Sequence, residues 1–153
     1  MSKTGYFEHW EREHLGSIGK YSVFKSTIES YNKSLEDGNY PLGFLIASSL
    51  LEDRIKSVWV IVEWKRRGIK PTPTDVSKCS LEGMLKDICD MGHISKTMRD
   101  KTLYILEERN ILTNLSMWNA DRYSEFICEK FFKYFRRYDE VVQKVKELYK
   151  EEL

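Results

Sequence analysis

Apolar residues recur every three or four positions along most of this chain, which is the spacing of one face of an α-helix. The clearest case is residues 42–67, whose apolar positions include Leu51, Ile55, Val58 and Val62. Gly68 follows, and glycine accepts the left-handed conformation that ends many helices. The pattern therefore predicts one long helix that ends at Gly68.

Four more helices are predicted in the same way, over residues 22–35, 81–91, 96–113 and 122–150. Ser80 and Ser95 are suited to cap the two helices that they precede. Pro71 and Pro73 predict a loop over residues 70–75, because proline lacks the backbone donor that a helix interior needs. No alternation of period two predicts a strand. We expect an all-α, up-and-down bundle of about five helices, three of them long.

The length of 153 residues fits a single domain, residues 1–153, that buries a core without disulfides or metals. Within it, residues 1–20 form an N-terminal segment in which aromatic residues stand among charges. That composition predicts a peripheral amphipathic helix, packed on the bundle or on a partner.

The composition excludes several classes of protein. The net charge is only +1, so the chain does not coat nucleic acid by charge, and any RNA contact must come from a local patch. No run approaches the ~18 apolar residues of a membrane span, and the N-terminus lacks the apolar core of a signal peptide. We expect a cytoplasmic protein without membrane contact. Cys79, Cys89 and Cys128 lack a paired metal-ligand spacing and are expected to be reduced and mostly buried.

Most familiar catalytic motifs are missing, including glycine-rich phosphate loops and a His-Glu-x-x-His pair. The three histidines, His9, His14 and His93, are expected to be non-catalytic. What stands out is Arg109-Asn110 followed by Asn114, because residues four apart share a helix face. A guanidinium suits phosphate, and this arrangement needs neither metal nor another cofactor. A structural alternative is that the positive charge of Arg109 stabilises the negative, C-terminal end of the helix dipole, and that the two asparagines end the helix.

Arg109, Asn110 and position 114 resemble the motif of the HEPN superfamily, in which Arg and a polar residue precede His by a few positions. The helix order over residues 21–148 resembles the layout of these small all-helical RNases. The resemblance implies a homodimer whose two motifs face one cleft, where the 2′-hydroxyl of RNA attacks its own phosphate without metal. It implies that Arg109 binds phosphate, Asn110 orients or polarises, and position 114 transfers a proton.

An acidic residue from an earlier helix often faces that cleft in the family, and Glu52 or Asp53 is our candidate for this role. An exposed ion pair with Arg54 or Lys56 is the alternative. Two basic clusters are candidates for RNA binding. They are Lys65, Arg66 and Arg67, and the group Lys133, Arg136 and Arg137. The aromatic residues around the second cluster are expected to lie in the core: Phe131, Phe132, Tyr134, Phe135 and Tyr138.

Asn114 stands where the motif has His, and an amide does not titrate near neutral pH. Either the chain lost catalysis and kept binding, or a toxic RNase was disabled by an engineered His-to-Asn replacement, which is the explanation we favour. In the branch of the family that pairs with a nucleotidyltransferase antitoxin, Tyr follows two residues after the His. This chain has Ser116 at that place, which argues against that branch. The prediction is an endoribonuclease of toxin or antiviral-defence type in disabled form, with RNA, a second copy, and an antitoxin or phage protein as partners. The alternative is a non-catalytic module that binds a protein or nucleotide.

Overall fold

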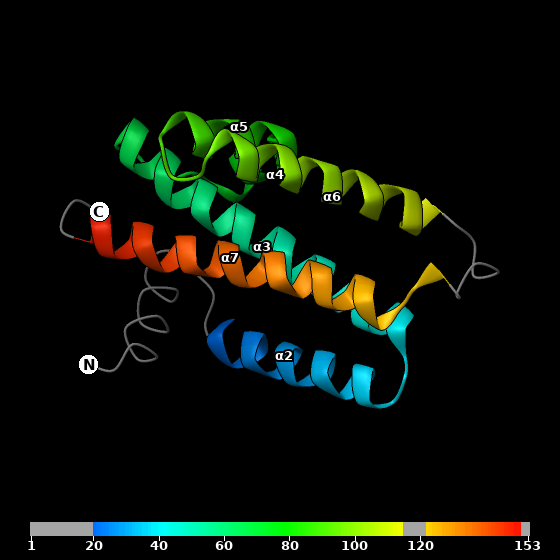
Figure 1. The fold of residues 1–153 in the computed structure, drawn as a ribbon. Helices are drawn as coiled ribbons and strands as arrows, with labels where there is room; N and C mark the ends of the chain where they lie inside the picture. Colours follow the sequence, from blue (N-terminus) through cyan, green and yellow to red (C-terminus); the bar gives the residue numbers. More distant parts are fainter. Residues whose placement is uncertain (1–19, 115–121, 151–153) are drawn as a thin grey trace.

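The computed structural model describes the backbone of residues 20–114 and 122–150, and the side chains of residues 24–112 and 122–150. These residues form six α-helices and no strand (Figure 1). The helices are α2 (Lys20–Glu36), α3 (Tyr40–Arg67), α4 (Pro73–Lys78), α5 (Leu81–Asp90), α6 (Lys96–Asn114) and α7 (Glu125–Tyr149). The prediction of an all-α bundle is confirmed. The N-terminal segment predicted as a peripheral helix lies outside the described residues.

The four longer helices, α2, α3, α6 and α7, alternate in direction along the bundle (Figure 1). Helix α3 is central, and it packs against α2, α5 and α7. Its residues Val58, Trp59, Val60, Ile61 and Val62 are all buried, which is the pattern of a helix covered on every side. The short helices α4 and α5 follow the end of α3, and α5 leads the chain to α6.

The structure confirms the helix ends that were predicted from the cap residues Gly68, Ser80 and Ser95. Gly68 has a φ of 75°, and its N–H donates to the carbonyl of Trp64. The hydroxyl of Ser80 accepts the N–H of Gly83 at 3.0 Å, and that of Ser95 accepts the N–H of Met98 at 3.0 Å. Each hydroxyl satisfies a donor that the first turn of its helix leaves unpaired.

The loop predicted over residues 70–75 is wrong in its second half, where α4 begins at Pro73. Thr72 and Asp75 form a capping box, in which each side chain accepts the backbone N–H of the other. Proline is compatible with the first position of a helix, because its missing N–H would have no partner there. The bundle therefore has six described helices rather than about five.

The core lies where α7 meets α2, α3 and α6. Of the α7 aromatics expected in the core, four are buried, Phe131, Phe132, Phe135 and Tyr138, whereas Tyr134 is only half-buried. The hydroxyls of Tyr138 and Thr102 lie 2.6 Å apart and join α7 to α6. The three cysteines carry free thiols, and Cys128 is buried while the other two are half-buried. Among the described helices, none is long and apolar enough to cross a membrane.

Candidate functional site

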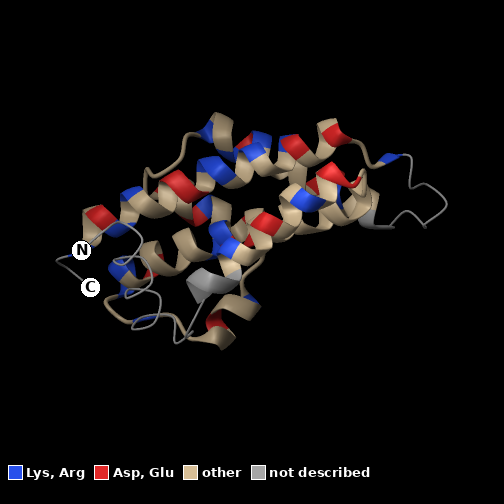
Figure 2. Ribbon diagram, turned by 90° about the horizontal axis from the view of Figure 1, so that it is seen from below, with Lys and Arg blue, Asp and Glu red and all other residues tan. Residues whose placement is uncertain are grey.

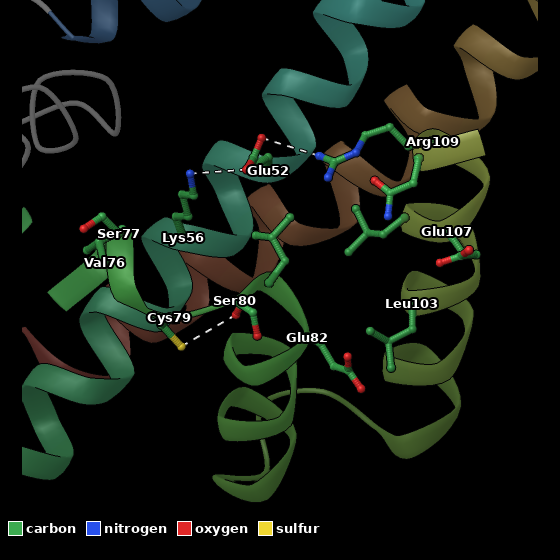
Figure 3. A pocket seen from close by; sticks show the side chains of 13 residues that line it. Glu52, Lys56, Val76, Ser77, Cys79, Ser80, Glu82, Leu103, Glu107 and Arg109 are labelled. Atoms are coloured by element: carbon green, nitrogen blue, oxygen red, sulfur yellow. Dashed lines mark hydrogen bonds and ion pairs between the residues drawn. The ribbon is translucent and has the colours of Figure 1, made fainter. Parts of the chain in front are cut away.

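Arg109 and Glu52 meet between α6 and α3 (Figure 3). Nη1 of Arg109 lies 3.5 Å from Oε2 of Glu52, although 57 residues separate them in the sequence. The other carboxylate oxygen of Glu52 lies 3.3 Å from Nζ of Lys56, one helical turn along α3. The structure thus places Glu52 beside the Arg-Asn pair, and it also contains the Glu52–Lys56 ion pair expected as the alternative.

An open pocket of about 460 Å³ adjoins this contact. Its walls come from three parts of the chain: α3, α6, and the segment from Val76 to Glu82 that joins α4 to α5 (Figure 3). Asn110 lines the pocket beside Arg109, and the exposed fraction of the Arg109 side chain is 20%. A ligand in the pocket can therefore reach both residues of the motif.

The charges around the pocket are mixed. Its cations are Lys56 and Arg109, and its carboxylates are Glu52, Glu82 and Glu107. An anion at Arg109 would compete with Glu52 for the guanidinium, and Lys56 offers that carboxylate an alternative partner. The Arg109–Glu52 separation of 3.5 Å is at the long end for a hydrogen bond, so this contact is weak.

Position 114 occupies the last residue of α6, one turn beyond Asn110. The side chain of Asn114 lies outside the described residues, as do Ser116, His9 and His14.

The cluster Lys65, Arg66 and Arg67 lies in the last turn of α3. Lys65 is 13 residues from Glu52, about 20 Å along the helix axis. Arg66 and Arg67 both bind the buried carboxylate of Glu63, at 2.6 and 2.7 Å. Hydrogen bonding to Arg66 lowers the pKa of Glu63. The fold therefore keeps this cluster away from Arg109 and uses two of its cations to neutralise Glu63, whose burial the sequence reading missed.

The second basic cluster lies on α7, facing α2. The guanidinium of Arg136 stacks over Phe132 at 4.7 Å, and that of Arg137 over Tyr134 at 5.3 Å. Both arginines line a separate pocket of about 500 Å³ between α2 and α7. Seen from below, basic and acidic positions are interspersed along the helices (Figure 2). Neither cluster joins the pocket beside Arg109.

His93 lies between α5 and α6, and its Nε2 is 2.8 Å from the hydroxyl of Tyr149 on α7. Burial lowers the pKa of this imidazole. The ring packs edge-on against Tyr149 and does not line the pocket beside Arg109. The contact gives His93 a structural role in holding the last turn of α7.

Other reactive groups near the motif are few. Cys79 lines the pocket, and burial raises the pKa of its thiol, which disfavours the nucleophilic thiolate. In residues 24–112 and 122–150, no three His, Cys, Asp or Glu side chains are grouped to hold a metal ion. No protein-family model, curated protein or solved structure matches the chain.

Proposed function

We propose that this bundle is a HEPN-like RNA-binding protein whose parent activity is metal-independent cleavage of RNA, disabled by Asn114. The observation that supports the proposal is the meeting of Arg109, Asn110 and Glu52 at one open pocket. The resemblance to the HEPN motif involves only Arg109, Asn110 and position 114. The position of Glu52 adds a third residue from a different helix.

In the proposed mechanism, the guanidinium of Arg109 binds the scissile phosphate, which displaces the carboxylate of Glu52. The 2′-hydroxyl oxygen of the RNA attacks phosphorus, a cyclic 2′,3′-phosphate forms, and the 5′-oxygen leaves with a proton. A group that titrates near neutral pH must move these protons, and His at position 114 would supply it. Asn114 does not, so the given chain binds without cutting.

The proposal includes a homodimer, in which a second copy brings another Arg109 to the same cleft. The pocket of one copy has three carboxylates and two cations, a charge balance that disfavours binding of a polyanion such as RNA. The second Arg109 would add a cation. A toxin or antiviral setting in the cytoplasm, with an antitoxin or phage protein as regulator, belongs to the same proposal.

The test is to incubate the chain and its Asn114→His variant with total cellular RNA in excess chelator and to map new ends. We expect cleavage by the Asn114→His variant only, and loss of cleavage when Arg109→Ala is added. Lys144→Ala is the matched control, because Lys144 is an exposed cation on α7 that belongs to neither basic cluster and does not line the pocket beside Arg109. Intact RNA with every variant would contradict the proposed RNase.

The excess of carboxylates favours a second candidate, a non-catalytic module that binds a basic segment of a protein partner. Glu52, Glu82 and Glu107 would then be the binding groups. In that case the Asn114→His variant leaves RNA intact. A lysine-rich peptide, used as the probe, then binds this chain more weakly after Glu82→Gln and Glu107→Gln.

A further inference from the structure

A second pocket adjoins the first on the other side of Lys56. It has a volume of about 320 Å³ and lies between α3 and the segment from Lys70 to Val76. Lys56 and Val76 line both pockets, so the two are neighbours along one surface. From α3 the second pocket takes Asp53, Lys56, Ser57 and Val60, whose spacing of three and four residues puts them on one helix face.

Four of the residues that line this second pocket are apolar: Val60, Pro71, Pro73 and Val76. Pro71 is buried and rigid, and Val60 is only 6% exposed, so these walls are held in place without a ligand. A volume near 300 Å³ with apolar walls is typical of a site for a small, flat group.

The polar residues that line the second pocket are Asp53, Lys56, Ser57 and Lys70, of which Lys70 offers a donor and Asp53 an acceptor. The ammonium of Lys70 lies 5.9 Å from the centre of the Trp64 ring, and burial lowers the pKa of this amine. The carboxylate of Asp53 is oriented by Arg54, whose Nη2 and Nε donate to Oδ2 at 2.6 and 3.1 Å. Apolar faces with a donor and an acceptor at the edge complement a nucleobase, which has two flat faces and a polar edge.

The position of this pocket relative to Arg109 suits one strand of RNA. Val60 lies eight residues beyond Glu52 on α3, about 12 Å along the axis. A phosphate at Arg109 and a base beyond Lys56 would therefore belong to the same or adjacent nucleotides. The pocket between α2 and α7 suits a base less well, because Tyr31 at 4.3 Å and Arg136 at 4.7 Å already cover the two faces of Phe132.

We propose that the pocket formed by Asp53, Val60, Lys70, Pro71 and Pro73 binds one nucleobase of the RNA whose phosphate is held at Arg109. This inference rests on the proposed function and assigns it a base-binding subsite. It makes Lys70 a residue that contributes to affinity only when the ligand carries a base.

The test compares the four nucleoside 5′-monophosphates with ribose 5-phosphate, by calorimetric titration of the chain as given. We expect at least one nucleotide to bind roughly tenfold more tightly than ribose 5-phosphate, the gain typical of one bound base. Lys70→Met should abolish that ratio while keeping the apolar contact with Trp64. Lys78→Met is the matched control, because Lys78 is exposed on α4 and lines neither pocket.

Arg109→Ala separates phosphate binding from base binding, since it should weaken nucleotides and ribose 5-phosphate equally and leave their ratio unchanged. Equal binding of nucleotides and ribose 5-phosphate, no binding of any nucleotide, or an unchanged ratio in Lys70→Met would each overturn the base pocket. The proposed RNase is tested separately by Asn114→His. Cleavage by that variant without a base-dependent ratio would remove only the base pocket. A base-dependent ratio without cleavage would remove only the RNase.

Discussion

The guanidinium of Arg109 on α6 lies 3.5 Å from the carboxylate of Glu52 on α3, and both residues line the same pocket. Glu52 is also paired with Lys56 at 3.3 Å, so one carboxylate is shared by two cations. This arrangement keeps Arg109 neutralised when the pocket is empty. In the proposed mechanism it also lets Glu52 remain paired with Lys56 when a phosphate takes the place of Glu52 at Arg109.

Glu52→Gln should therefore strengthen RNA binding. The variant removes the group that competes for Arg109, and a partly exposed ion pair of this kind is worth up to about 1 kcal/mol, so we expect a gain of roughly twofold to fivefold. Fluorescence anisotropy with a labelled single-stranded RNA measures it. Glu82→Gln removes the same charge from the same pocket without a contact to Arg109, and it should change the affinity less. Weaker binding by Glu52→Gln would contradict the exchange between carboxylate and phosphate.

Glu63 should contribute to stability at neutral pH. Its side chain is fully buried, and Arg66 and Arg67 hold its pKa below the ordinary value of 4.5. A lowered carboxyl pKa adds stability above pH 4.5, and that stability is lost as the pH falls through the folded-state pKa. Glu63→Gln should lower the free energy of unfolding by about 1–3 kcal/mol at neutral pH, and by less in acid.

Urea unfolding at neutral pH and at about pH 3 measures this difference. Glu147→Gln is the control, because Glu147 pairs with Lys150 on the surface with 70% of its side chain exposed. The control should unfold like the parent chain at both pH values. An equal loss for both variants would mean that burial of Glu63 adds nothing.

Tyr138 should make the bundle sensitive to alkali. Burial raises the pKa of its hydroxyl from 10.0 to about 12, while the hydrogen bond with Thr102 acts in the opposite direction. Stability is therefore fully present below pH 10 and falls between pH 10 and about pH 12, as the unfolded chain loses the proton first. One such tyrosine contributes a slope of about 1.4 kcal/mol per pH unit.

Tyr138→Phe should remove that part of the alkaline slope and cost about 1 kcal/mol at neutral pH, through loss of the hydrogen bond with Thr102. Urea unfolding over the alkaline range measures both effects. The matched control is Tyr104→Phe, since Tyr104 is 71% exposed on α6. Burial raises the pKa of Tyr31 as well, so part of the slope should remain in Tyr138→Phe. An unchanged slope in that variant would contradict the prediction.

Local sequence signals were enough to predict most of the helices and their ends. Ser80, Ser95 and Gly68 act through hydrogen bonds and backbone conformations within a few residues, so their effects can be read from short stretches. Helix α4 was missed because Pro71 and Pro73 suggested a loop. Thr72 and Asp75 carry a capping signal that could have revealed it.

The sequence by itself determined that the chain is helical, and it singled out Arg109, Asn110 and either Glu52 or Asp53 as candidates. Only the tertiary structure decided that Glu52 contacts Arg109, because that contact depends on how α3 and α6 pack, and no local pattern encodes it. Packing also determines that Arg66 and Arg67 form ion pairs with Glu63. In sequence they form a basic cluster, but burial of Glu63 requires nearby cations, because an unpaired charge inside a protein is costly.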